Sequence, residues 1–257
     1  MSNFIELSKD NYIPKKPWHK KMTGIIFLTF SFVIVGLTLA FLILLGYYLW
    51  NLKFGDSKQI TEKFNTHFSF STDVPLETRP KIEEDVNQYI RYFNPTLDNT
   101  NVPITIIAFI DFECPFSQES YPIFQQVIEK YGPVVNVVFK HFPLMSIHPN
   151  AVQASIASTC AQDQGKFWEY YDLLFINKSL DSGSLVKYAK DLNLNMPNFQ
   201  SCVETQKNRV NIEQDLKDGV DLGVRGTPTY IVNQTKLEGS VSLTSWDSII
   251  VKELQDN

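Results

Sequence analysis

The tetrapeptide Cys114–Ser117, with the sequence Cys-Pro-Phe-Ser, is the part of this chain best suited to chemistry. It follows an apolar run over residues 103–112, which is typical of a buried strand, and it begins a helical pattern. The first turn of a helix favours negative charge, so a cysteine placed there is favoured as the reactive thiolate. Proline suits the first helical position, which Pro115 would occupy. We therefore predict that Cys114 is a nucleophile rather than an inert buried cysteine.

A second short motif, Thr227-Pro228, lies far downstream and precedes another strand-like run over residues 229–233. A cis peptide bond before Pro228 would expose a backbone edge beside Cys114. An extended substrate could then pair with Thr227 as an added strand. Phe116 is predicted to be an exposed docking side chain. The alternative is a proline that only begins a strand at a turn.

The segments around the first motif alternate between strand and helix. Residues 124–131 have apolar positions spaced for one face of a helix, which Pro122 should kink and Gly132 should end as its C′ residue. Residues 134–139 are typical of a second buried strand, and a strand–helix–strand unit implies a parallel pair. A weaker alternation over residues 89–93 predicts an edge strand.

The rest of the chain is predicted to complete an α/β domain. Residues 149–218 contain several apolar stripes at helical spacing, which indicates a helical insertion of about seventy residues. Strand patterns over residues 229–233 and 236–238 follow, and a last helix is predicted over residues 244–254.

A resemblance to a known family is carried by five segments, which occur in this order along the chain: Phe109–Phe116 (Phe-Ile-Asp-Phe-Glu-Cys-Pro-Phe), Val138–Leu144 (Val-Phe-Lys-His-Phe-Pro-Leu), His148–Ala151 (His-Pro-Asn-Ala), Gln164–Trp168 (Gln-Gly-Lys-Phe-Trp) and Gly223–Thr229 (Gly-Val-Arg-Gly-Thr-Pro-Thr). They resemble the DsbA-like thiol–disulfide oxidoreductases over about residues 100–235. The resemblance implies a thioredoxin-like fold with an inserted helical domain. It also implies Cys114 as the nucleophile and Pro228 as a cis-proline. Substrate contacts are expected at Pro115, Phe116 and Thr227.

Ser117 departs from this family, in which a second cysteine normally stands at that position. A serine hydroxyl cannot close a disulfide with Cys114, so a mixed disulfide on Cys114 must be released by an outside thiol. This favours monothiol roles: isomerase-like shuffling, removal of small-thiol adducts or substrate trapping. A second hypothesis is a redox-inactive binding or assembly module that uses the groove beside Pro228.

The partners expected from the resemblance are exported protein substrates or small thiols. A quinone-linked membrane oxidase is the family's usual redox partner, but it acts on a dithiol, which Ser117 removes. Residues 1–21 carry a net charge of +3, so the rest of the chain carries −5 − 3 = −8, and such an acidic domain argues against nucleic acid as a partner. No cofactor is expected, and none of the four histidines is spaced with cysteines or carboxylates as a metal site requires.

Two further cysteines, Cys160 and Cys202, lie on helical stripes of the insertion. They are interpreted as two buried thiols, a structural disulfide or a resolving pair for Cys114, and the family resemblance suggests the disulfide. Asp111 and Glu113 flank Cys114 on the face opposite Phe112. A carboxylate there would disfavour the thiolate or relay protons, unless it is simply solvated.

An uncharged apolar stretch over residues 24–50 predicts a transmembrane helix. At ~1.5 Å per residue it is roughly 40 Å long, and a bilayer core of about 30 Å can be spanned by it with some tilt. No small-x-small cleavage site follows it, and Tyr47, Tyr48 and Trp50 suit an interface, so we expect an uncleaved signal anchor.

Charge on the two flanks of this stretch predicts its orientation. Residues 1–21 contain five lysines against Glu6 and Asp10, a net charge of +3, and the rest of the chain therefore carries −8. The positive-inside rule places the N-terminus in the cytoplasm and the C-terminal domain in the periplasm or outside the cell. The expected organisation is a tail, an anchor, a tether and a DsbA-like thioredoxin domain with an insertion at about 146–218, over residues 1–21, 22–50, 51–79 and 80–257.

Overall fold

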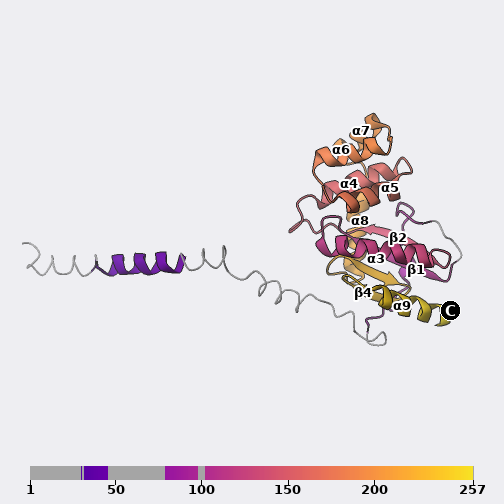
Figure 1. Ribbon diagram of the computed structural model, residues 1–257, viewed down its shortest axis with the longest axis horizontal. Helices are drawn as coiled ribbons and strands as arrows, with labels where there is room; N and C mark the ends of the chain where they lie inside the picture. The colour runs from indigo at the N-terminus through magenta and orange to yellow at the C-terminus, as the bar shows by residue number, and fades with distance from the viewer. Residues whose placement is uncertain (1–29, 31, 46–78, 98–101, 257) are drawn as a thin grey trace, which may run out of the picture. The chain divides into compact units, whose positions relative to one another are not determined.

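The computed structural model drawn in Figure 1 describes four stretches of the chain: residues 30, 32–45, 79–97 and 102–256. They belong to two compact units that divide after His67, and each is considered by itself.

In the first unit, residues 32–45 form a helix whose side chains are all exposed. Among the residues that the structure describes, no helix is both long enough and apolar enough to span a bilayer. The predicted span over residues 22–50 extends past both ends of this helix into residues outside the described ones. The transmembrane anchor therefore stays a prediction.

A four-stranded sheet forms the centre of the second unit. Strand β1 (Ile104–Ile110) pairs in parallel with β2 (Val135–His141) and antiparallel with β3 (Thr229–Val232). Strand β3 also pairs antiparallel with β4 (Thr235–Glu238), so the strand order is β2-β1-β3-β4. The predicted apolar strands and the predicted parallel pair are confirmed.

Helices cover both faces of this sheet, which explains why every residue of β1 except Thr105 is apolar. Ile104 and Ile106 belong to a cluster with α3 (Pro115–Tyr131) and α9 (Leu243–Asp256) on one face. Ile107 faces the opposite cluster, where α8 (Arg209–Asp221) crosses behind β2. The chain enters α3 directly after β1, so the turn between them is fixed by buried elements on both sides.

The predicted helical insertion is also confirmed. Figure 1 shows its first four helices gathered at the end of the domain that lies away from α9, whereas α8 packs against β2. These four helices are α4 (Ala151–Gln162), α5 (Phe167–Asn177), α6 (Ser182–Asp191) and α7 (Met196–Thr205). Cys160 of α4 and Cys202 of α7 are joined by a disulfide with an S–S distance of 1.99 Å.

Removing this disulfide is expected to destabilise the domain. It closes a loop with a sequence separation of 42 residues. Such a loop corresponds to roughly 4 kcal/mol of lost chain entropy in the unfolded state. The double variant Cys160→Ala/Cys202→Ala should therefore unfold at lower urea concentration, and the reduced wild type should match it. Equal unfolding midpoints for the oxidised wild type and the double variant would contradict this.

The stretch before β1 differs from the edge strand predicted over residues 89–93. It contains η3, a 3-10 helix over Val86–Tyr89, and then turns. The side chain of Asp85 caps this helix by accepting a hydrogen bond from the backbone N–H of Asn87 at 2.9 Å. A local cap of this kind competes with strand pairing. The edge strand predicted from the weak alternation of apolar residues is therefore wrong.

Residues 80–97, called the strap below, nevertheless protect both edges of the sheet. A single antiparallel bridge joins Lys81 to Thr235 of β4. A second bridge joins Thr96 to Val138 of β2 at the opposite edge. Covering edge strands in this way blocks pairing with other chains.

Gly132 ends α3 as predicted, but it is the C-cap of the helix rather than the C′ residue. Its φ of −45° is right-handed, and its N–H donates to the carbonyl of Ile128 at 2.8 Å. A Cβ at this position would lie 2.8 Å from the same oxygen, so close approach rather than backbone handedness requires glycine. The helix continues through Pro122 to Tyr131 as one element.

Candidate active site

Cys114 lies at the corner where β1 turns into α3. It is the N-cap of α3 with extended backbone angles, and Pro115 follows in the first turn. The backbone carbonyl of Cys114 accepts the N–H of Gln118 at 3.0 Å, the first hydrogen bond of the helix. The thiol is therefore held at the end of the helix where unpaired N–H groups favour a negative charge. Only 4% of Cys114 is exposed.

The distant Thr-Pro motif lies against this thiol. The Thr227–Pro228 peptide bond is cis, and β3 begins directly after it beside β1. The Cys114 thiol donates to the carbonyl oxygen of Thr227, with an Sγ–O distance of 3.1 Å. The structure thus brings together the predicted nucleophile and the residue before the cis-proline, which lie 113 residues apart in the sequence.

The remaining residues of the tetrapeptide divide into a buried and an exposed set. Ser117 is only 2% exposed, and its hydroxyl has no hydrogen-bond partner among the described residues. Pro115 and Phe116 are exposed, Phe116 by 42%, which agrees with the predicted docking side chain. Because Cys160 and Cys202 are bonded to each other in the insertion, Cys114 is the free thiol of this chain.

The two carboxylates flanking Cys114 both bind the loop between β2 and α4. Asp111 is fully buried and accepts hydrogen bonds from Leu144 N at 2.8 Å and from the His148 ring at 2.7 Å. Glu113 accepts from both the backbone and the side chain of Asn150, at 2.6 and 2.9 Å. Neither carboxylate is simply solvated, and both hold the loop against the corner that carries the thiol.

His141 is enclosed by aromatic rings rather than by polar partners. Its ring lies 4.9 Å from that of Phe139 and 6.0 Å from that of Phe112, and neither ring nitrogen has a hydrogen-bond partner among the described residues. Burial, together with the neighbouring charge of Lys140, lowers the pKa of His141 to about 3. The imidazole is therefore neutral at physiological pH.

This buried imidazole should make the protein sensitive to acid. The unfolded state gains a proton near pH 6.5, but the folded state does so only near its lowered pKa. The contribution of neutral His141 to the free energy of unfolding is therefore fully present above about pH 6.5. It is lost as the pH falls from there towards 3, by up to about 1.4 kcal/mol per pH unit. Between about pH 7 and pH 5, the wild type should lose roughly 2 kcal/mol more stability than His141→Phe. Equal losses in urea unfolding experiments would contradict this.

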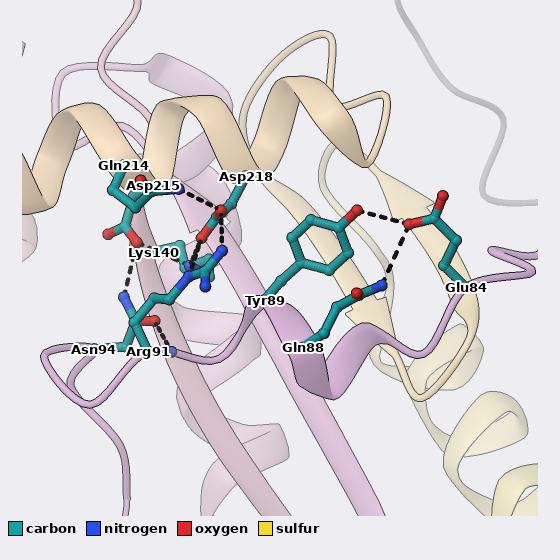
Figure 2. A network of polar contacts seen from close by, with 9 residues as sticks. All are labelled: Glu84, Gln88, Tyr89, Arg91, Asn94, Lys140, Gln214, Asp215 and Asp218. Carbon is teal, nitrogen blue, oxygen red and sulfur yellow. Dashed lines mark hydrogen bonds and ion pairs between the residues drawn. The ribbon is translucent and has the colours of Figure 1, made fainter.

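A buried ion network on the far face of the sheet was not predicted from the sequence (Figure 2). Lys140 of β2 is fully buried and donates to Asp215 at 2.9 Å and to Asp218 at 2.8 Å. Burial opposes the charged form of Asp218, but hydrogen bonds from Arg91 and Lys140 lower its pKa to about 2. The available signal was a lysine within an apolar strand and two aspartates one helical turn apart.

No metal site accompanies these residues in the described part of the chain. Within residues 79–97 and 102–256, no three histidine, cysteine or acidic side chains gather as ligands would. The groups that the described residues bring together at this site are the Cys114 thiol, the carbonyl before cis-Pro228 and the N-terminus of α3.

Comparisons with known proteins agree with this geometry. Residues 94–252, more than half of the chain, match a family model described as thioredoxin. The chain is 33% identical over 150 residues to the Na(+)/H(+) antiporter NhaA 1 of Salinispora arenicola, a match that covers 58% of this chain and 23% of the antiporter. The chain thus spans about a quarter of the length of this relative.

Solved structures show the same fold at low sequence identity. A thioredoxin-like oxidoreductase from Silicibacter pomeroyi superposes with a TM-score of 0.60 at 20% identity, covering 68% of this chain and 99% of that one. The α-DsbA1 protein of Wolbachia pipientis superposes with a TM-score of 0.59 at 20% identity, covering 67% and 97%.

Proposed function

The chain belongs to the thioredoxin family and has the fold of DsbA-like proteins, and from this premise we propose that it is a thiol–disulfide oxidoreductase that works through Cys114 alone. One observation carries this proposal. The thiol of Cys114, at the N-terminus of α3, lies 3.1 Å from the carbonyl oxygen that precedes cis-Pro228. An extended substrate that displaces the thiol from this carbonyl could pair with the backbone of Thr227, as in β-strand addition.

The reaction proceeds by two exchanges at sulfur. The Cys114 thiolate, its proton released to solvent, attacks one sulfur of a substrate disulfide; a new S–S bond forms to Cys114 and the other substrate sulfur leaves as a thiolate. An outside thiolate then attacks the substrate sulfur of this mixed disulfide and releases the Cys114 thiolate. Cys114 ends as it began, so the cycle shuffles disulfides or removes thiol adducts without net oxidation.

The proposed setting is the outer side of a membrane. The lysine-rich residues 1–21 and the apolar stretch up to Trp50 support a single-pass anchor with the thioredoxin domain in the periplasm or outside the cell. The bonded Cys160 and Cys202 are consistent with an oxidising compartment. Exported proteins or small-thiol adducts are the substrates that this position would supply.

A turnover assay tests the proposal. The full chain in detergent is mixed with a peptide whose single cysteine carries a glutathione adduct, and reduced glutathione is added to complete the cycle. We expect the peptide thiol to be released catalytically, at a rate proportional to the concentration of the protein. Release no faster than in buffer alone would overturn the proposal.

A second candidate, a redox-inactive peptide-binding module, is favoured by one observation. Cys114 is nearly inaccessible, and the carbonyl that would receive a substrate strand already accepts its thiol hydrogen. Under this alternative the peptide would bind equally well to the wild type and to a variant without Cys114, and no covalent adduct would form.

A further inference from the structure

Arg91 of the strap binds Asp218 of α8 through a bidentate ion pair. Its Nη2 lies 2.7 Å from Asp218 Oδ1 and its Nε lies 3.0 Å from Asp218 Oδ2. Asp218 is 1% exposed, whereas the Arg91 side chain is 35% exposed, so the pair links a buried acid to the outer surface. Bidentate pairs of this geometry fix orientation as well as position. Asn94 adds a second attachment by donating to Asp215 at 2.8 Å (Figure 2).

The end of α8 continues directly into the cis-proline loop. The N–H groups of Leu222 and Val224 donate back to the carbonyls of Asp218 and Gly219 at 3.0 and 2.8 Å. Both side chains are buried in the same apolar cluster as Val86 of the strap. Three residues after Val224, the chain reaches the Thr227 carbonyl that accepts the thiol hydrogen of Cys114.

The same network also binds the end of β2 through hydrogen bonds. Asp215 accepts the backbone N–H of His141 at 3.0 Å as well as the ammonium group of Lys140. The next residue, Phe142, donates its N–H to the carbonyl of Ile110 at 2.9 Å, at the end of β1. The acids of α8 therefore hold the strand end beside the β1–α3 corner, while the helix itself leads to the cis-proline loop.

We propose that Arg91 is a positioning residue, and that the strap holds α8 so that the cis-proline loop stays at the Cys114 thiol. In the sequence, the strap lies between the predicted membrane anchor and β1. The segment that leads from the predicted anchor into the domain therefore contacts α8, the helix that leads to the cis-proline loop. The catalytic meaning rests on the proposed function, but the mechanical coupling from Arg91 to residues 222–228 does not.

Hydrogen exchange in the full chain tests the coupling. In Arg91→Gln, the hydrogen-bonded amides of residues 222–224 should exchange about tenfold faster or more, because the ion pair that restrains α8 is lost. Arg91→Lys keeps the charge but cannot form the bidentate pair, so its rate of amide exchange in the loop should lie between those of Arg91→Gln and the wild type. The matched control is Arg209→Gln, which removes an exposed ion pair with Glu213 at the other end of α8 and should leave the loop unchanged.

The exchange of α9 separates local loosening from general unfolding. Acceleration confined to the strap, or none, in Arg91→Gln would overturn the proposal. If exchange in α9 also accelerates, the variant has lost its fold, and Arg91→Lys is then judged by the same criterion at the amides of residues 222–224. Loosening of the loop in Arg209→Gln to the same extent would also overturn the proposal.

Reaction rates show whether the coupling matters to the site. In Arg91→Gln, a small alkylating reagent should modify Cys114 at least as fast as in the wild type, because it does not use the loop. Formation of the mixed disulfide with the glutathionylated peptide should slow about fivefold or more, because the pairing edge is no longer held in place. If the wild type forms no mixed disulfide but the exchange result holds, the proposed function fails and the coupling stands. If the wild type forms the mixed disulfide and Arg91→Gln forms it at the same rate, the positioning role fails.

Discussion

Replacing Cys114 with serine is expected to reduce thiol–disulfide exchange by on the order of 10³-fold or more, the scale on which enzymes lose activity when a covalent nucleophile is removed. A hydroxyl at the N-terminus of α3 is far less ionised than a thiol, and it forms no disulfide. Cys160 and Cys202 cannot substitute for it because they are bonded to each other. Release of the thiol from a glutathionylated peptide, followed for both proteins, is the measurement.

The structure provides a control for this substitution. Cys114 forms a single weak side-chain hydrogen bond, to the Thr227 carbonyl, which a serine hydroxyl can also donate to. Urea unfolding of Cys114→Ser should therefore remain close to that of the wild type, within about 1 kcal/mol. A variant that stays folded and keeps full turnover would remove Cys114 from the mechanism.

Replacing Ser117 with cysteine is expected to increase the rate at which bound substrate is released from Cys114. The substitution places a thiol three residues after Cys114, on the first turn of α3, where it can attack the mixed disulfide within the molecule. Intramolecular attack corresponds to an effective concentration of molar or more. Release of a bound substrate should therefore become about 10³-fold faster than release by ~1 mM external thiol.

The environment of Ser117 favours this experiment. Its hydroxyl is buried without a hydrogen-bond partner among the described residues, so a thiol, which needs none, should cost no stability. Ser120→Cys is the matched control, because Ser120 is also buried on α3 but lies farther along the helix. Decay of the mixed disulfide without added thiol should accelerate only in Ser117→Cys. Equal decay in the wild type and Ser117→Cys would show that the missing second thiol does not limit the cycle.

The parts of the fold that were predicted from the sequence are those with strong local patterns. Every residue of Ile104–Ile110 except Thr105 is apolar because helices cover both faces of the sheet, and such a run is visible without any knowledge of its neighbours. The strap has no comparable signal. Its contacts with the sheet edges are single bridges at Lys81 and Thr96, and a strand pattern of one residue cannot be recognised.

The candidate site shows the same division. Cys114 and Pro228 follow from residue types at recognisable turns, and they are in contact in the structure through Thr227. The partners of Asp111 and Glu113 were not predicted, since they lie in a loop whose position depends on the packing of α4. The pairing of Lys140 with α8 likewise depends on how distant elements meet, although a lysine in a buried strand requires some acidic partner.

The central claim is that Cys114 attacks substrate disulfides. It is tested most directly by mixing the full chain with a disulfide-bearing peptide, quenching with acid and mapping the products by mass spectrometry. We predict one peptide adduct, located on Cys114, that forms in proportion to peptide concentration and disappears when an external thiol is added. Binding of the peptide with no adduct on Cys114 would contradict the claim, and would identify the chain as a thioredoxin-fold binding module.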